Sequence, residues 1–177
     1  LHLEDYRVAI DAGAYDGDTA HELIALCPNV ERIYAFEPDR RNFRKLCAGA
    51  EGEARILPIN AAVWCESTTL IFEDSGNRNA GLTDTPAEAT DSILPSTADN
   101  PYFGKTAEVP VTALDTVAED IFGGHTHIDY IKYDVEGAET EALLGSRRII
   151  ERDAPALLVS AYHRSADLFR LPLLVHE

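Results

Sequence analysis

The stretch that decides the fold is residues 7–19, RVAIDAGAYDGDT. Residues 8–10 are an apolar run typical of a buried parallel strand, and a turn with Gly13 and Gly17 follows them. Residues 19–22, TAHE, have the form of a capping box and predict the start of a helix. Strand, glycine turn and helix form the opening unit of a doubly wound α/β sheet, which places a ligand over the carboxyl end of the strand.

The spacing of the glycines indicates which ligand this turn suits. A dinucleotide fold requires G-x-G-x-x-G, but here Tyr15 stands between Gly13 and Gly17 and the middle glycine is absent. Asp11 ends the strand, and a carboxylate there cannot cradle a phosphate but can receive an ammonium group or orient water near one. The turn therefore favours a ligand with an ammonium group. The alternative is a plain connection between strand and helix.

The composition restricts the partners. The chain of 177 residues suits one domain, residues 1–177, and its formal charge of −16 disfavours nucleic acid and anionic membrane surfaces. Cys27, Cys47 and Cys65 are far apart and form no C-x-x-C pair, so we expect reduced, mostly buried thiols and a cytoplasmic location. No run approaches the ~18 apolar residues of a spanning helix. The oligomeric state stays open.

An acid follows the second predicted strand, residues 32–36. Glu37 lies ~20 residues past the glycine turn, where doubly wound folds place an acid on ribose hydroxyls. A carboxylate accepts two hydroxyl bonds at once, so Glu37 indicates an adenosine cofactor without choosing between methyltransferases and NAD enzymes. The alternative is a helix-capping or solvated acid. Asp39 can cap the next helix.

The third predicted strand, residues 55–63, carries Asn60 near its end, with Ala61 beside it. An amide can pair with the edge of an adenine ring, and a small residue leaves space for the ring; Asn60 is otherwise a turn residue. Residues 74–105 are rich in Ser, Thr, Asp, Asn, Gly and Pro. They predict a mobile loop on the substrate side or an idle surface insertion.

Polar residues end each strand of the predicted parallel sheet, whose fourth and fifth strands are residues 128–135 and 154–161. Because the carboxyl ends of parallel strands meet at one edge, we expect one crevice there. The residues expected to converge on it are Asp11, Glu37, Asn60, Asp134 and His163. We also expect an extended segment at 108–114 and helices from 115 or 116, from 138 to 150 and from 165 to 177.

The last two strand ends carry the candidates for proton transfer. Asp134 or Glu136 could orient the cofactor or accept a proton, and His163 could deprotonate a hydroxyl group. A divalent metal held by these three residues is an alternative that no spacing demands, so we assign no metal site. His125 and His127 are interpreted as solvated loop residues.

Taken together, these segments resemble the FkbM family of methyltransferases. The matching pieces are DAGAYDGDT, FEPD, INAAVW, VTALD, IKYDVEGAE and AYH, in order over nearly the whole chain. The resemblance implies a Rossmann-like class I methyltransferase fold with a mostly parallel, doubly wound sheet. It also implies S-adenosylmethionine as methyl donor and O-methylation of a hydroxyl on a sugar, glycan or other small natural product.

The resemblance assigns roles by position. The residues implied to bind the cofactor are Asp11, Gly13, Tyr15, Gly17 and Thr19 at its methionine end, Glu37 at the ribose, and Asn60 and Ala61 at the adenine. Those implied to face the methyl group and the acceptor are Asp134, Glu136 and His163. His163 is the first candidate for the base, and Asp134 the second.

The sequence departs from the family at two places. Tyr15 replaces an Asn that is common in the family, which affects the role of its side chain but not the turn. The family fold ends in an antiparallel strand pair for which the residues after the fifth strand leave no room, so we expect this pair to be missing, either because the sequence is truncated or because the sheet is incomplete. The rival interpretations are a non-catalytic module that binds adenosine compounds or a protein and, less well supported, an NAD-dependent oxidoreductase.

Overall fold

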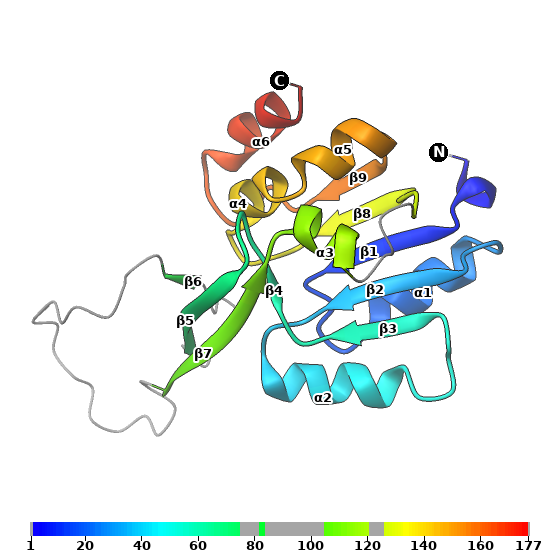
Figure 1. The fold of residues 1–177 in the computed structure, drawn as a ribbon, viewed down its shortest axis with the longest axis horizontal. Coiled ribbons are helices and arrows are strands. Elements are labelled where there is room, and N and C mark those ends of the chain that lie inside the picture. Colours follow the sequence, from blue (N-terminus) through cyan, green and yellow to red (C-terminus); the bar gives the residue numbers. More distant parts are fainter. Residues whose placement is uncertain (1, 75–81, 84–104, 121–125, 177) are drawn as a thin grey trace, which may run out of the picture.

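A five-stranded parallel sheet forms the centre of the computed structural model, which describes residues 2–74, 82–83, 105–120 and 126–176 (Figure 1). The strand order is β3-β2-β1-β8-β9, and every neighbouring pair is parallel. The bounds are β1 (Val8–Ala12), β2 (Arg32–Phe36), β3 (Ile56–Ile59), β8 (Tyr130–Tyr133) and β9 (Ala156–Val159). The chain order changes direction between β1 and β8, which is where doubly wound folds bind their ligands.

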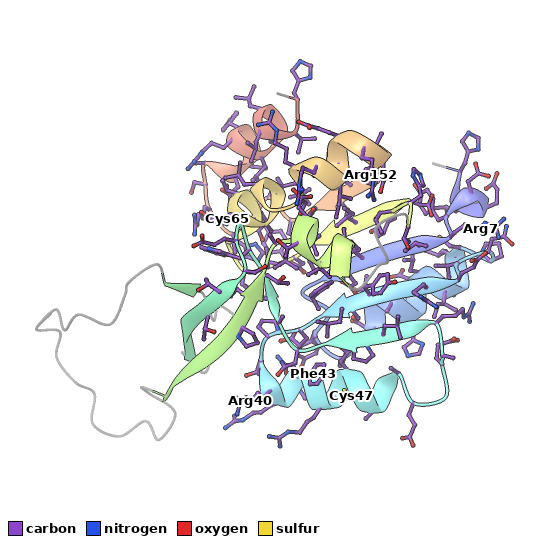
Figure 2. The ribbon with its side chains drawn as sticks, viewed as in Figure 1. Arg7, Arg40, Phe43, Cys47, Cys65 and Arg152 are labelled. Carbon is purple, nitrogen blue, oxygen red and sulfur yellow. The ribbon has the colours of Figure 1, made fainter. Side chains whose placement is uncertain are left out.

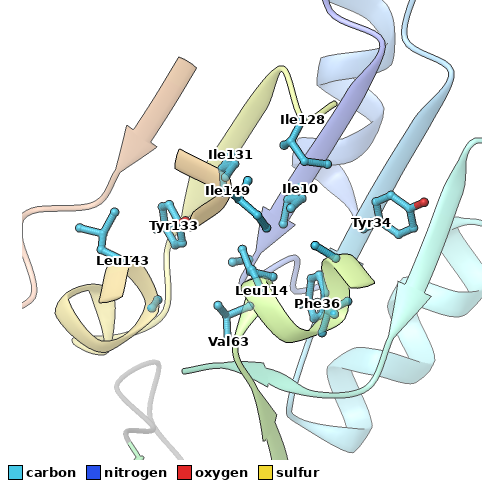
Figure 3. Packing of buried hydrophobic residues seen from close by; sticks show 14 of the residues in the cluster. Ile10, Tyr34, Phe36, Val63, Leu114, Ile128, Ile131, Tyr133, Leu143 and Ile149 are labelled. Carbon is cyan, nitrogen blue, oxygen red and sulfur yellow. The ribbon is translucent and has the colours of Figure 1, made fainter. Parts of the chain in front are cut away.

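Helices cover both faces of this sheet (Figure 1). Their bounds are η1 (Leu3–Asp5), α1 (Asp18–Leu26), α2 (Arg40–Gly49), α3 (Leu114–Asp120), α4 (Glu139–Leu144), α5 (Arg147–Asp153) and α6 (Asp167–His176). Successive residues of a strand face opposite sides. Ala9 therefore packs with α1 and α2, whereas Ile10 packs with Leu114 of α3 and Ile149 of α5 (Figure 3). No helix in the described part of the chain is long and apolar enough to cross a membrane.

A second sheet stands beside the first, and the sequence did not predict it. Its strand order is β4-β7-β5-β6, with β4 (Ala62–Val63), β5 (Thr68–Asp74), β6 (Leu82–Thr83) and β7 (Lys105–Thr112). The prediction of one strand over 55–63 was wrong, because the chain leaves the central sheet after Ile59 and pairs with β7 from Ala62 onward. The predicted loop over 74–105 lies mostly outside the described residues, apart from β6 and the two strand ends.

Several predicted helix boundaries were also wrong. Thr19 is not a helix cap: α1 already begins at Asp18, and Gly17, in a left-handed conformation at φ 92°, stands at the cap position without a side-chain bond. The predicted helix over 138–150 is two helices that meet at Gly145, where a side chain would overlap the Trp64 carbonyl. In contrast, the cap at Asp39 is confirmed, since its Oδ1 accepts hydrogen bonds from two backbone N–H groups of α2.

Further differences concern the ends of elements and the cysteines. Three predicted segments are present with bounds that differ by a few residues: β7 for 108–114, β9 for 154–161 and α6 for 165–177. The helix predicted from 115 or 116 is α3, which begins at Leu114. Within the described ranges, all neighbouring strands of the central sheet are parallel, without an antiparallel pair. Cys27 is buried as expected, but Cys47 and Cys65 are exposed (Figure 2).

The glycine turn after β1 is pressed against the end of β8. The Gly13 and Ala14 N–H groups donate to the Phe36 carbonyl at 3.0 and 2.9 Å, and the Asp134 N–H donates to the Ala12 carbonyl at 2.9 Å. Gly13 has φ 89°, and a Cβ there would overlap the Asp134 carbonyl. Only glycine therefore lets these two backbones meet.

We predict that Gly13→Ala lowers the free energy of unfolding by at least about 3 kcal/mol, because left-handed strain and the overlap with Asp134 add together. Gly52→Ala is the matched control. Gly52 has a similar φ of 86° but nothing within 4 Å of an added Cβ, so this change should cost only about 1–2 kcal/mol. Urea unfolding of both variants measures the difference. Equal losses would contradict the close approach of the two backbones.

Candidate active site

Polar side chains form two groups at the carboxyl edge of the central sheet. The Glu37 cluster consists of Tyr15, Glu37, Asp39 and Asn60, at the end of β2. The His163 cluster consists of Asp134, Glu136, Glu139, Tyr162 and His163, after β8 and β9. The end of β1 lies between them because β1 pairs with both β2 and β8.

Glu37 is a buried acid that backbone groups hold in place. It is 6% exposed; its Oε2 accepts from the Tyr15 N–H and its Oε1 from the Asp39 N–H, both at 2.9 Å. Burial raises the pKa of Glu37 to about 7, although the two N–H donors oppose this rise. Each oxygen keeps a lone pair for another donor. The side chain is therefore fixed, and its contact with ribose hydroxyl groups stays a prediction.

Asn60 supports the same turn. Its Nδ2 donates to the carbonyls of Glu37 and Pro38 at 2.8 and 3.1 Å. Both amide protons thus bind the chain itself, and the side chain holds the turn that carries Glu37. Ala61, next to it, is 8% exposed. Contact of either residue with adenine stays a prediction.

Tyr15 takes a backbone conformation that asparagine adopts more readily. Its φ is 51°, in the left-handed region, where a Tyr is uncommon and Asn is enriched. The half-exposed ring lies under Lys45, whose Nζ is 4.6 Å from the ring centre and donates to the Tyr15 hydroxyl at 3.2 Å. The backbone of Tyr15 therefore serves the site through Glu37, while its side chain contacts α2.

Asp11 already holds an ammonium group, that of Lys132. Lys132 Nζ donates to Asp11 Oδ1 at 2.9 Å and to the Gly13 carbonyl at 3.0 Å, so the glycine turn is fixed from β8. Burial nevertheless raises the pKa of Asp11, and its buried Oδ2 has no partner. Sequence reasoning missed Lys132; the signal was one lysine inside an apolar strand. Contact between Asp11 and a cofactor stays a prediction.

The remaining predicted residues of the turn lie along its path into α1. Gly17 donates its N–H to the Ala14 carbonyl at 2.8 Å, which closes the turn. Thr19 lies in the first helical turn, and its N–H donates to Asp18 Oδ1 at 2.6 Å. Together with Gly13, these residues place the N-terminus of α1 at the carboxyl edge of the sheet, where it favours negative charge.

His163 is surrounded by carboxylates. Its Nε2 lies 3.3 Å from Glu136 Oε2 and 3.7 Å from Asp134 Oδ1, and its Nδ1 lies 2.9 Å from Glu139 Oε1. The Tyr162 hydroxyl donates to Asp134 Oδ1 at 2.8 Å, and this bond is the main cause of a raised pKa for Tyr162. Burial raises the pKa of Glu136, while His163 opposes that rise. The three predicted residues Asp134, Glu136 and His163 do come together.

Glu139 is the residue of this cluster that sequence reasoning missed. It is 1% exposed, and its Oε1 accepts from the Val135 and Gly137 N–H groups at 3.1 and 3.3 Å. It thereby stabilises a strained turn in which Glu136 has φ 54° and Gly137 φ 94°. The available signal was a second acid in the segment EGAE.

The residues expected to form one crevice therefore lie in two clusters, which the backbone connects. The close approach of Gly13 and Asp134 connects them. Of the two histidines interpreted as loop residues, His125 lies outside the described residues, and His127 lies in a loop 3.5 Å from Asp129 and 3.4 Å from Asp153. A surface hollow lined by Cys47 and Pro58 lies at the other end of β3 and contains none of the predicted site residues.

Comparisons with known proteins bear on the family and the fold of this chain. Residues 11–173 match the family model described as "Methyltransferase FkbM domain". The chain is also similar to the crystal structure of methyltransferase FkbM from Methylobacillus flagellatus KT, with a TM-score of 0.69 and 24% sequence identity. That likeness covers 99% of this chain and 38% of the other, so this chain spans well under half the length of that protein. No curated protein matches.

We predict that the free energy of unfolding falls by up to about 3 kcal/mol as the pH rises from 4.5 through 7, because of Glu37. Its pKa is higher in the folded protein (about 7) than the ordinary 4.5, so the folded state holds a proton that the unfolded state has lost. Glu37→Gln should flatten this slope, whereas Glu51→Gln, an exposed control, should not. Urea unfolding at pH 5 and pH 8 measures it; equal slopes in all three proteins would contradict the buried acid.

Proposed function

Because the chain belongs to the FkbM family of methyltransferases, we propose that it transfers the methyl group of S-adenosylmethionine to a hydroxyl oxygen. The observation that carries this proposal is the buried carboxylate of Glu37, fixed at the end of β2 beside the glycine turn. An acid at this position of a doubly wound sheet binds ribose hydroxyls.

The donor is proposed to lie along the edge from β2 to β8. Glu37 would accept the ribose hydroxyls, and Asn60 and Ala61 would flank the adenine. The turn formed by Asp11, Gly13, Tyr15, Gly17 and Thr19 would lie under the methionine part. A carboxylate that accepts hydroxyl donors favours its charged form, so binding would lower the pKa of Glu37 and release a proton.

The acceptor is proposed to lie at the His163 cluster. Methyl transfer is an in-line displacement on an already activated donor, so the protein chiefly aligns the two reactants and excludes water. Without a bound ion, His163 is the first candidate to accept the hydroxyl proton and Asp134 is the second. His163 follows β9 and Asp134 follows β8, so both lie at the carboxyl edge of the sheet. The acceptor class proposed is a sugar, glycan or other small molecule with a hydroxyl group.

The rival functions differ from this proposal in what they require. An NAD-dependent oxidoreductase would need a glycine where Tyr15 stands, with backbone amides free for a pyrophosphate. A non-catalytic module would bind the cofactor without turnover on a panel of hydroxylated acceptors. The exposed cysteines Cys47 and Cys65 support a reducing, cytoplasmic location.

We predict that Glu37→Ala weakens the binding of S-adenosylhomocysteine by about 1.5–3 kcal/mol, the size of a lost charge-assisted hydrogen bond. Calorimetric titration measures the change, with exposed Glu51→Ala as control and circular dichroism to check folding. Unchanged affinity in a folded Glu37→Ala protein would remove Glu37 from the ribose site.

We predict that His163→Ala lowers turnover at least about a hundredfold, as for a lost general base, and lowers donor affinity much less. Transfer of a radiolabelled methyl group to hydroxylated acceptors measures turnover, and calorimetry measures affinity. His127→Ala is the control, since this histidine also lies beside carboxylates but away from the strand ends. Equal losses of turnover and affinity at His163 would argue against its role in transfer.

A further inference from the structure

Three side chains of the types that bind metal ions lie close together at the proposed acceptor site. Asp134, Glu139 and His163 each present a ligand atom, and these atoms lie within 4.8 Å of one another. Glu136 adds a further carboxylate oxygen 3.3 Å from His163 Nε2. They come from the segment after β8 and from the segment after β9, which adjacent parallel strands bring together.

Two buried polar atoms in this group lack hydrogen-bond partners. Glu139 is 1% exposed, and its Oε2 has no partner. The Nδ1 of His163, whose side chain is 11% exposed, lies 2.9 Å from Glu139 Oε1 but without hydrogen-bond alignment. Buried polar groups normally have partners, so the Oε2 of Glu139 points to a missing ligand.

The charge of the group is also unbalanced. Three carboxylates face one imidazole, and no Lys or Arg of the described ranges forms an ion pair with any of them. The Arg164 guanidinium lies over the backbone at Gly137, with Nε 3.4 Å from the position of an added Cβ. A buried carboxylate without a cation costs several kcal/mol, which a divalent ion would offset.

The spacing suits ligands of a single ion. Ligand atoms about 2.1 Å from one ion lie about 3.0 Å apart at a right angle and about 3.4 Å apart at a tetrahedral angle. The ligand atoms of Asp134, Glu139 and His163 lie within 4.8 Å of one another, close to the separation of about 4.2 Å between ligands on opposite sides of one such ion, so modest side-chain movements would place them around it.

We propose that Asp134, Glu139 and His163 hold a divalent cation, with Glu136 on its more exposed side. The donor set is one imidazole nitrogen and carboxylate oxygens, which suits a first-row ion such as Mn²⁺ better than Ca²⁺, whose ligands are oxygens alone. Three or four protein ligands leave positions open for water or for an acceptor hydroxyl.

The binding of this ion does not depend on the proposed function, but its role does. An ion beside the acceptor would lower the pKa of a hydroxyl bound to it. His163 would then act as a ligand and not as the base, because a nitrogen bound to a metal cannot accept a proton.

His127 provides a matched comparison within the same chain. It also lies beside two carboxylates, 3.5 Å from Asp129 Oδ1 and 3.4 Å from Asp153 Oδ1. Its side chain is 62% exposed, and Arg152 already pairs with Asp153 at 2.7 Å. His127 therefore has the same types of neighbouring residue as His163, but within the described residues its surroundings lack a buried carboxylate oxygen without a hydrogen-bond partner.

The test is titration of the full chain with Mn²⁺, without methyl donor, followed by electron paramagnetic resonance and calorimetry at 0.15 M salt. We expect one saturable Mn²⁺ per chain. His163→Gln and Asp134→Asn should each raise its Kd at least tenfold, whereas His127→Gln should leave it unchanged. Circular dichroism checks folding. If His163→Gln does not fold, Asp134→Asn, at a partly exposed position, provides the test instead.

Two results would overturn the site. One is weak binding of several ions that neither variant alters, which would be a diffuse response to the charge of −16. The other is an equal loss in His127→Gln. Binding of S-adenosylhomocysteine is measured separately on the same samples, so a failure of the metal site and a failure of the proposed function give different results.

Discussion

The contact between the backbones of Gly13 and Asp134 is the constraint on which the site depends. It forces the turn after β1 against the end of β8, and only a residue without a side chain allows it. Lys132 reinforces the contact from β8 by binding both Asp11 and the Gly13 carbonyl. As a result, the Glu37 cluster and the His163 cluster lie on the same edge of the sheet, which suits a reaction that requires alignment of two substrates.

Buried charge marks the same edge. The buried polar and charged residues of the described chain are Asp11, Glu37, Lys132, Glu139, Ser146 and Asp167. The first four belong to the candidate site, and the three acids among them have different partners. Asp11 has Lys132, Glu37 has backbone N–H groups, and Glu139 has backbone N–H groups and an imidazole at Oε1 but no partner at Oε2. Burial of an acid costs free energy. The grouping of three buried acids at one edge of the sheet therefore supports a functional role for that edge.

The central sheet and the edge that carries the site could be predicted from the sequence, because apolar runs and strand-end acids are local signals. The runs at β1, β2 and β8 and the acids Glu37 and Asp134 were placed correctly. The second sheet was not predicted, because the pairing of β4 with β7 joins residues distant in sequence. Lys132 and Glu139 were missed for a related reason: a sequence shows which residues end a strand, but not which side chains turn inward to bind one another.

The most direct test of the central claim is calorimetric titration of the unmodified chain with S-adenosylhomocysteine, with NAD as control. We expect S-adenosylhomocysteine to bind with a micromolar Kd, about −8 kcal/mol, and NAD to give no heat. A folded protein that binds NAD equally well, or that does not bind S-adenosylhomocysteine, would contradict a donor site at the edge formed by β1, β2 and β8.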